Sequence, residues 1–234
     1  MTNARGKWRI LIIDDHPIVR QGLALLINHE RDMEVCGEGD NPSEALKTIA
    51  RLKPDLAIVD LSLQGASGLD LIKTVAERFP AVAVLVLSMH DESLYGERSL
   101  RAGARGYIMK EEASSNLLKA VRQVLTGALY ASESLKLKML EKLSGVSGPS
   151  PVSLIETLSD RELEVFEMIG DGWGTRQIAE KICVSVKTVE SYRAHIKEKL
   201  KVESAAQLVQ QAVQHRQLES PSGRNPPPSR LSSR

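Results

Sequence analysis

Residues 10–19 read ILIIDDHPIV, and this stretch decides the fold of the first half of the chain. Four apolar residues run directly into Asp14 and Asp15, two adjacent carboxylates. A run that is apolar throughout is typical of a strand buried on both faces by crossover helices. Adjacent carboxylates repel each other at neutral pH unless a positive group lies close to them. The stretch therefore predicts a buried strand that ends at an acidic site holding a cation.

Four further apolar runs repeat this pattern up to about residue 130, and amphipathic helical patterns separate them. Five strand–helix units of this size predict an α/β fold, a flavodoxin-like doubly wound five-stranded parallel sheet with the strand order 2-1-3-4-5. We expect the strands at residues 9–13, 33–38, 55–60, 81–88 and 105–109.

Composition sets limits on the class of protein. The 234 residues leave room for two small domains, and 31 Lys and Arg nearly cancel 30 Asp and Glu, so a nucleic-acid surface requires local charge segregation. The N-terminus lacks a signal-peptide core, and no run approaches the ~18 apolar residues that span a bilayer. These features predict a cytoplasmic protein without a membrane partner. Cys36 and Cys183 are far apart in sequence and are expected to be buried free thiols.

The composition changes after the first domain. Residues 143–153, LSGVSGPSPVS, have the content of a flexible linker, and a helix is expected just before them at 134–142. Later periodic segments are all helical, which predicts a small all-α helix-turn-helix domain. We divide the chain into a first domain at 1–130, a linker at 131–153, a helical domain at 154–216 and a disordered tail at 217–234.

Chemically active side chains follow the predicted strands at their carboxyl ends. In an open parallel sheet, ligands bind outside these ends, at the crevice where the strand order reverses. Three carboxylates brought together there require a hard cation, and Mg²⁺ is the natural candidate. The side chains are Asp14 and Asp15 after the first strand, Asp60 at the end of the third, Ser88 at the end of the fourth and Lys110 after the fifth.

Asp60 is also placed to act as a nucleophile. A carboxylate beside Mg²⁺ can accept a phosphoryl group as an aspartyl phosphate, chiefly through positioning and charge neutralisation. We expect Lys110 to neutralise phosphoryl charge and the Ser88 hydroxyl to bind a phosphoryl oxygen. Taken singly, each residue is more simply explained as a cap or a loop residue. Their occurrence in order at successive strand ends favours a common site.

The motifs LIIDDHPIVRQGL, DLAIVDLSL, VLVLSMHDE and GARGYIMK resemble the receiver domain of two-component response regulators of the NarL/FixJ type, over about residues 8–128. The resemblance implies a sensor histidine kinase as the phosphoryl donor. It further implies that Asp60 is the phosphoacceptor, that Asp15, Asp60 and the backbone carbonyl of Ser62 bind Mg²⁺ with Asp14 completing the acidic pair, that Ser88 and Lys110 contact the phosphoryl group, and that Tyr107 is an aromatic switch.

Two positions depart from the receiver pattern. Leu63 and Gln64 stand where many receivers have a Met-Pro pair, which alters the loop after Asp60 without removing a chemical group. Glu111 stands where a proline commonly follows the lysine, so a cis peptide bond is not expected there.

Capping residues divide the second half of the chain into helices. Ser159 and Glu162 have the spacing of a capping box, so a helix begins after Ser159. Thr175 and Ser185 are each expected to cap the next helix. The two helices on either side of the tight turn before Ser185 predict a helix-turn-helix.

The third helix of this domain has distinct faces. Val189, Tyr192, Ile196 and Leu200 share one face and are expected to pack inward. Residues 185–201 contain five Lys or Arg and two acidic residues. A basic helix with short polar residues near its N-terminus suits the major groove of DNA, but a solvated face would have similar charges. Charge alone therefore leaves the question open.

The segment from Leu158 to about Val213 resembles the LuxR-type DNA-binding domain through LSDRELEV, Gly172, Ile178-Ala179, SVKTVE and Lys199-Leu200. The resemblance implies binding to double-stranded DNA as a homodimer, with dimer contacts from a helix at about 204–215. Tyr192 and Ala205 stand where His and Arg are frequent, so phosphate contacts are not transferred to them. The expected DNA-binding residues are Thr175, Lys187, Thr188, Glu190, Ser191, Arg193, Ala194 and Lys197.

These observations favour a phosphorylation-controlled transcription factor and leave two rivals. One is an interaction protein whose helix-turn-helix no longer binds DNA, which the presence of Lys187 and Arg193 disfavours. The other is a phosphohydrolase working through an aspartyl phosphate. That enzyme would need a general acid near Asp60, and only Ser62 stands two residues beyond it. We therefore expect a regulator and not an enzyme.

Overall fold

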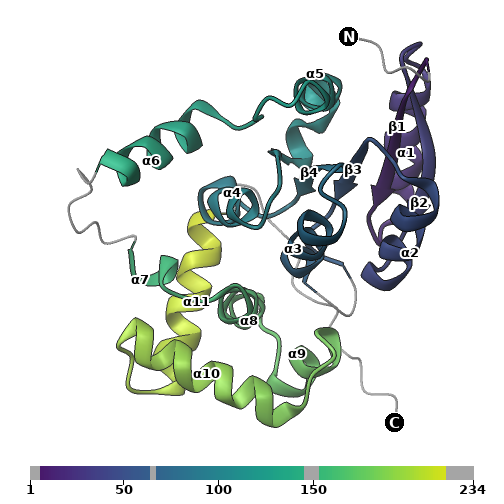
Figure 1. Cartoon of the computed structure of the whole chain (residues 1–234). Coiled ribbons are helices and arrows are strands. Elements are labelled where there is room, and N and C mark those ends of the chain that lie inside the picture. The colour runs from purple at the N-terminus through teal and green to yellow at the C-terminus, as the bar shows by residue number, and fades with distance from the viewer. Residues whose placement is uncertain (1–5, 64–66, 145–152, 220–234) are drawn as a thin grey trace. The chain divides into compact units, whose positions relative to one another are not determined.

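A computed structural model describes residues 6–63, 67–144 and 153–219 of the chain (Figure 1). Two compact units divide between Ser147 and Gly148. Each unit is described separately below. Among the described residues, no helix is long and apolar enough to cross a membrane.

The first unit contains the five-stranded parallel sheet that the sequence predicts. Its strand order is β2-β1-β3-β4-β5, and the predicted strand positions are confirmed to within a few residues. Residues 10–13 are fully buried, because helices cover both faces of the sheet. The strands are β1 (Trp8–Ile13), β2 (Met33–Gly39), β3 (Leu56–Val59), β4 (Ala83–Ser88) and β5 (Gly106–Met109).

Helices alternate with these strands. Alternate strand residues such as Ile10 and Ile58 pack on one face with Ile27 and Val121 of the first and fifth helices. Leu26 of the first helix is 42% exposed. The helices are α1 (Pro17–Asn28), α2 (Pro42–Leu52), α3 (Gly68–Arg78), α4 (Glu92–Arg101), the short 3₁₀ helix η1 (Lys110–Glu112) and α5 (Ala113–Leu125).

The segment after α5 remains attached to the first unit. Tyr130 forms a parallel bridge with Gly106 of β5, and the chain continues into α6 (Glu133–Ser144), which contacts α4. The helix expected at 134–142 is therefore confirmed as α6, and this part of the interval 131–153 packs on the receiver. Residues 145–152 of that interval lie outside the described part of the chain.

The second unit is all-helical. Ser159 Oγ accepts a hydrogen bond from the Glu162 amide, and Glu162 Oε2 accepts one from the Ser159 amide, so the predicted capping box is confirmed. Ser185 caps α10 as expected, with its side chain accepting from Thr188 N at 3.0 Å. The helices are α7 (Ser153–Glu156), α8 (Asp160–Gly170), α9 (Thr175–Lys181), α10 (Val186–Leu200) and α11 (Ala205–Glu219).

Four expectations about single residues were wrong. Gly174, not Thr175, is the N-cap of α9, and its amide donates to Gln177 Oε1 at 2.8 Å. Tyr192 is only half-buried, whereas Val189 and Ile196 of the same face are fully buried. Cys183 is exposed and Cys36 is half-buried, so neither is a core thiol.

Within the helical unit, α8 packs closely against α11. A Cβ at Gly170 would lie 2.5 Å from the Ala212 carbonyl oxygen, so only glycine permits this approach of the two backbones. Arg216 donates to both carboxylate oxygens of Asp171, at 2.8 and 2.9 Å. The last helix ends at Glu219 and not near His215 as expected. The rest of the predicted tail, 220–234, lies outside the described residues.

Candidate functional site

The carboxyl ends of four strands bring the predicted side chains together. Lys110 Nζ lies 2.6 Å from Asp14 Oδ2 and 2.7 Å from Asp60 Oδ2, so one ammonium group bridges the ends of β1 and β3. Asp14 and Asp60 are 2% exposed and Ser88 is fully buried. Lys110 is thus one of the positive groups that the paired carboxylates require, a role the sequence had assigned to a metal ion.

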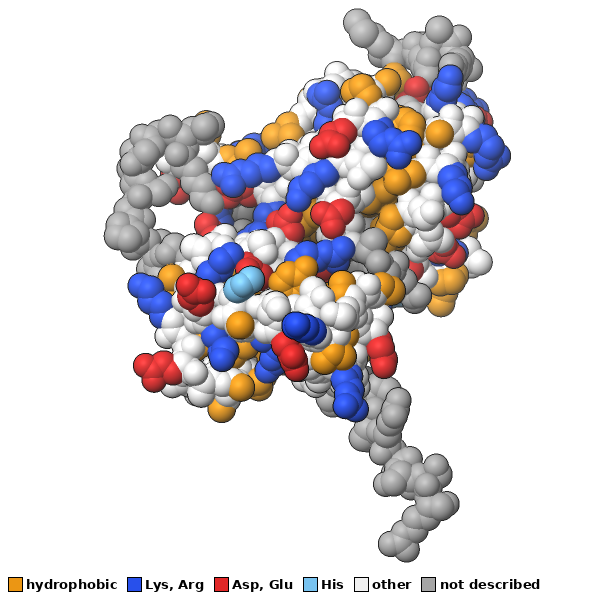
Figure 2. All heavy atoms as spheres, turned by 60° about the horizontal axis from the view of Figure 1, so that its bottom comes forward, with side chains coloured by type: hydrophobic (Ala, Val, Ile, Leu, Met, Phe, Trp, Pro, Cys, Tyr) orange, Lys and Arg blue, Asp and Glu red, His pale blue; other side chains and the backbone are white. Residues whose placement is uncertain are grey.

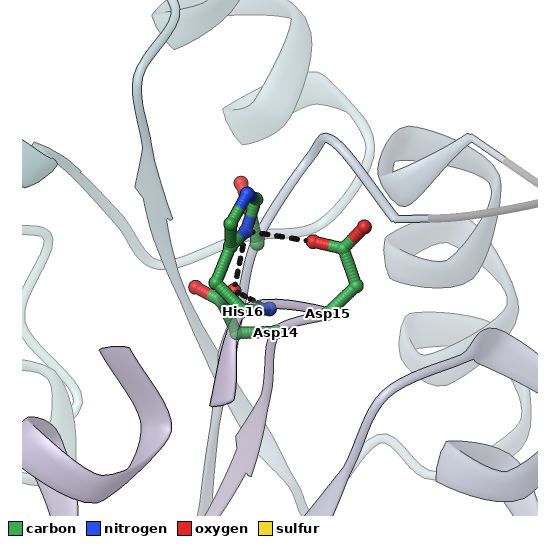
Figure 3. A group of neighbouring side chains, drawn as sticks. Asp14, Asp15 and His16 are labelled. Atoms are coloured by element: carbon green, nitrogen blue, oxygen red, sulfur yellow. Dashed lines mark hydrogen bonds and ion pairs between the residues drawn. The ribbon is translucent and has the colours of Figure 1, made fainter. Parts of the chain in front are cut away.

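His16 also contacts both carboxylates of this site, and sequence analysis did not identify it. Figure 3 shows its ring directed between the two carboxylates, with Nδ1 3.1 Å from Asp14 Oδ1 and 2.8 Å from Asp15 Oδ1. Its backbone amide also donates to Asp14 Oδ1 at 2.8 Å. The clue in the sequence was its position directly after the acidic pair and before Pro17, the first residue of α1.

The donor set of this cluster suits a hard cation. Ligand atoms of Asp14, Asp15, His16 and Asp60 all lie within 4.8 Å of one another. Asp15 Oδ1 is buried and accepts no hydrogen bond of ordinary geometry, although His16 Nδ1 lies 2.8 Å from it. A buried carboxylate oxygen without a hydrogen bond is costly unless a cation binds it. Three carboxylates from two strand ends therefore fit a divalent ion with oxygen ligands.

Burial and charge act in opposite directions on the pKa values of the central pair. Burial raises the pKa of Asp60, against the lowering effect of the nearby Lys110 ammonium, and Asp14 raises it further. Burial lowers the pKa of Lys110, but Asp60 and Asp14 together outweigh this and raise it. The two carboxylates thus favour the charged form of Lys110, whereas burial disfavours the ionised form of Asp60.

The loops around Asp60 are tied together by His90, a second residue that sequence analysis did not single out. Its Nε2 lies 3.0 Å from Ser62 Oγ, and its amide donates to Ser88 Oγ at 3.2 Å. The Tyr107 hydroxyl donates to the His90 carbonyl at 2.8 Å, and the Tyr107 ring is 1% exposed. The side chain that the receiver resemblance assigns as an aromatic switch is therefore buried in this structure. Ser62 also donates its amide to Asp60 Oδ1 at 3.2 Å.

Gly68 allows the start of α3 to lie against the backbone that follows Asp60. A Cβ at Gly68, the first residue of α3, would lie 2.5 Å from Leu61 Cα and 2.6 Å from the Asp60 carbonyl oxygen. Leu63, at one of the positions that depart from the receiver pattern, is buried, so it anchors this loop. Gln64 lies outside the described residues.

The predicted DNA-reading residues lie on the surface of the helical unit. On α10, Lys187, Glu190, Ser191 and Ala194 are exposed. Figure 2 shows Lys and Arg side chains interspersed with Asp and Glu on the side of the molecule that it draws. The other predicted DNA-binding residues are half-buried: Thr175, Thr188, Arg193 and Lys197.

An ion pair fixes α10 on α8. Lys199 Nζ lies 2.5 Å from Glu162 Oε2, the carboxylate that completes the capping box of α8. His195 Nδ1 lies 3.8 Å from the other oxygen of Glu162. Burial raises the pKa of Glu162, but the hydrogen bonds from Lys199 and Ser159 outweigh it and lower the pKa. The Glu162 carboxylate thus adds a polar contact to the apolar packing that holds the candidate recognition helix on α8.

Each of the two units matches a known protein family. Residues 10–122 match the response regulator receiver domain, and residues 156–212 match the bacterial regulatory proteins of the luxR family. The oxygen regulatory protein NreC of Staphylococcus epidermidis is 38% identical over 216 residues, which cover 90% of this chain and 99% of NreC. The NreC protein of Staphylococcus aureus is 37% identical over 215 residues, with the same coverage.

Solved structures of a second relative cover both units. RcsB from Salmonella enterica serovar Typhimurium, bound to the promoter rprA in the presence of the phosphomimetic BeF3-, is similar with a TM-score of 0.63 and 28% identity over 88% of this chain and 98% of RcsB. Another RcsB structure, from Salmonella typhimurium, has a TM-score of 0.68 and 27% identity over 89% of this chain and 98% of RcsB.

A parallel receiver sheet with an acidic pocket, followed by a helix-turn-helix, defines a two-component response regulator. The family matches and the NreC relatives show that this chain belongs to the NarL/FixJ type of that family, with a receiver domain and a LuxR-type DNA-binding domain. Members of this family are DNA-binding regulators, and phosphorylation control is typical of them.

Proposed function

We propose that Asp60 accepts a phosphoryl group from the histidine of a partner sensor kinase, and that the modified receiver promotes binding of the helical domain to double-stranded DNA. The observation that carries this proposal is the bridge from Lys110 to both Asp14 and Asp60, beside the buried Asp15 Oδ1. This arrangement supports a role for Asp60 as nucleophile, for Lys110 as a fixed positive charge and for Asp15 as a cation ligand.

Asp14, Asp15, Asp60 and the backbone carbonyl of Ser62 would hold Mg²⁺, as the buried oxygen of Asp15 suggests. When bound, the ion supplies neutralisation of the charge on the phosphoryl oxygens. Lys110 provides a second cation, already held in position by two carboxylates. The Asp60 carboxylate attacks phosphorus, the donor imidazole leaves, and Ser88 donates its hydroxyl hydrogen to a phosphoryl oxygen.

Intact-mass measurement with Mg²⁺ and acetyl phosphate tests this assignment. The wild type should gain one acid-stable, base-labile phosphoryl group, and Asp60→Asn should gain none. Asp70→Asn, at an exposed position on α3, is the matched control and should be labelled like the wild type. Equal labelling of wild type and Asp60→Asn would refute the assignment.

We further propose that α10 reads the major groove, with Lys187, Arg193 and Lys197 neutralising phosphates and Glu190 and Ser191 near base edges. Thr175, Thr188 and Ala194 would line the same surface, where small side chains allow close approach. The exposure of Lys187, Glu190 and Ser191 supports this division. Active protein would bind as a cytoplasmic homodimer.

DNA titrations separate the two kinds of contact. Arg193→Ala and Lys197→Ala should weaken binding to all sequences and flatten the salt dependence by about one unit per lost phosphate contact. Glu190→Lys should change the preferred bases, at about 1–3 kcal/mol per base contact. Lys119→Ala on α5 is the control and should behave like the wild type. An unchanged consensus for Glu190→Lys would refute this placement of the reading face, and no binding by the wild type would favour the interaction-protein rival.

Ser88 and Tyr107 would couple phosphorylation of Asp60 to dimerisation and DNA binding. Phosphorylation adds about 1.5–2 negative charges at Asp60, and the Ser88 hydroxyl can turn toward the new oxygens. Ser88→Ala should then accept phosphate but gain little dimerisation or DNA affinity. Sedimentation and DNA titration with and without beryllofluoride measure this. An identical response in wild type and Ser88→Ala would contradict the coupling.

A further inference from the structure

Residues 128–141, which we call the strap, lie along β5 and α4 of the receiver. We propose that the strap is a phosphorylation-sensitive docking element, held on β5 and α4 before Asp60 is phosphorylated and released afterwards. This inference rests on the proposed function of Asp60. The surface of β5 and α4 is thus an interaction surface whose occupant is a segment of the same chain.

Backbone pairing with the edge of the sheet forms the first anchor of the strap. The Tyr130 amide donates to the Arg105 carbonyl at 2.9 Å, and the Tyr107 amide donates to the Tyr130 carbonyl at 3.1 Å. A Cβ at Gly106 would lie 3.0 Å from both Cβ and the carbonyl oxygen of Tyr130, so a glycine permits this close pairing. The strap therefore covers part of an edge strand that would otherwise offer unpaired backbone groups.

Contacts with the first two turns of α4 form the second anchor. Glu92 Oε1 accepts from the Ser132 amide at 3.1 Å, and the Ser93 carbonyl accepts from Lys138 Nζ at 2.9 Å. Leu135 is 2% exposed, and a Cβ at Gly96 would lie 2.6 Å from its Cδ2. The absence of a side chain at Gly96 therefore leaves the space that Leu135 fills.

The rest of α6 adds little to docking. Leu137 is 58% exposed and Leu140 is 60% exposed, so the outward face of the helix buries little apolar surface. Among the described side chains, docking depends on the buried Leu135 and Ala131, on the partly buried Tyr130, on a few hydrogen bonds and on the short pairing with β5. Segments with few buried apolar contacts open at low free-energy cost. A small displacement of α4 is therefore sufficient to release the strap.

A short chain of contacts connects the strap to the phosphoacceptor. Ser88 Oγ accepts from the His90 amide, and the His90 carbonyl accepts from the Tyr107 hydroxyl. The same loop leads directly into α4, whose first residue, Glu92, holds the strap. If Ser88 turns toward phosphoryl oxygens, the His90 amide loses its acceptor and the loop shifts. Glu92 then moves away from Ser132 while Tyr107 is loosened beside Tyr130.

Hydrogen exchange of the full-length chain, measured with Mg²⁺ in the presence and absence of beryllofluoride, tests the release. Amides of residues 128–141 should exchange roughly fivefold faster with beryllofluoride, the equivalent of one net hydrogen bond. Asp60→Asn should show no change. Exchange of residues 83–88 in β4 should stay slow throughout, since the sheet itself does not open.

Two variants release the strap without the phosphoryl mimic. Gly96→Ala places a methyl group where Leu135 lies, and Leu135→Ala removes the buried side chain. In both variants the amides of residues 128–141 should exchange rapidly without beryllofluoride. Leu137→Ala, on the exposed face of the same helix, is the control and should behave like the wild type. If a variant fails to fold, the comparison of wild type with Asp60→Asn still tests whether beryllofluoride at Asp60 releases the strap.

The outcomes separate this inference from the proposed function. Fluorine NMR reports whether beryllofluoride binds at Asp60. If beryllofluoride binds but the amides of 128–141 exchange at an unchanged or slower rate, the proposed release of the strap is refuted and the role of Asp60 is not. No binding at all would overturn the role of Asp60 and the strap with it.

Discussion

Glu162 offers a quantitative test of how the helical domain is held together. Glu162 Oε2 accepts from the Ser159 amide at 2.7 Å and from Lys199 Nζ at 2.5 Å, and the residue is 5% exposed. Glu162→Gln keeps an acceptor for the Ser159 amide but loses the charge opposite Lys199. Because hydrogen bonds to charged groups contribute about 1.5–3 kcal/mol, we expect Glu162→Gln to cost about 1.5–2 kcal/mol and Glu162→Ala about 2.5–4 kcal/mol.

Urea unfolding followed by tryptophan fluorescence measures these costs. The chain has two tryptophans, so Trp8→Phe leaves Trp173 as the reporter of the helical domain. Glu180→Gln, at an exposed position on α9, is the matched control and should change stability by less than about 0.5 kcal/mol. Equal midpoints for wild type and Glu162→Gln would refute the reasoning.

The pH dependence of the same variants supplies an independent check. The folded domain lowers the pKa of Glu162 below its ordinary value of 4.5, so the stabilisation is fully present above pH 4.5. It is lost as the pH falls through the lower pKa of the folded state, where the carboxyl becomes protonated. Wild type and Glu162→Gln should therefore converge in acid. A difference that does not change with pH would show that Lys199 is not the cause.

Three further results are expected. Mg²⁺ at tenfold its dissociation constant should stabilise the receiver by about 1.4 kcal/mol in urea unfolding, with no effect on Asp15→Asn; equal stabilisation of both would exclude Asp15 as a ligand. Gly68→Ala should cost about 1–3 kcal/mol and slow labelling by acetyl phosphate, because its Cβ would lie 2.5 Å from Leu61 Cα; a normal labelling rate would contradict this. Ser185→Ala should cost about 1 kcal/mol through loss of the α10 cap, and an unchanged urea midpoint would count against that cap.

Local patterns in the sequence determined much of the fold. The apolar runs placed all five strands, because strands buried on both faces need apolar side chains along their whole length. The capping box at Ser159 and the cap at Ser185 were readable because each acts over three residues. The rule that parallel strands place their carboxyl ends at one edge also predicted the meeting of Asp14, Asp60 and Lys110.

Only the tertiary structure decided the contacts that join segments distant in sequence. The bridge of Lys110 to both carboxylates and the contacts of His90 depend on the distances between loops, which no periodic pattern encodes. Likewise, Lys199 meets Glu162 only because α10 packs on α8. Gly174 caps α9 in place of Thr175, because the Gln177 side chain folds back to its amide. The sequence predicted the helix at 134–142, but only the tertiary structure shows that it docks on α4, where the missing side chain of Gly96 leaves space for Leu135.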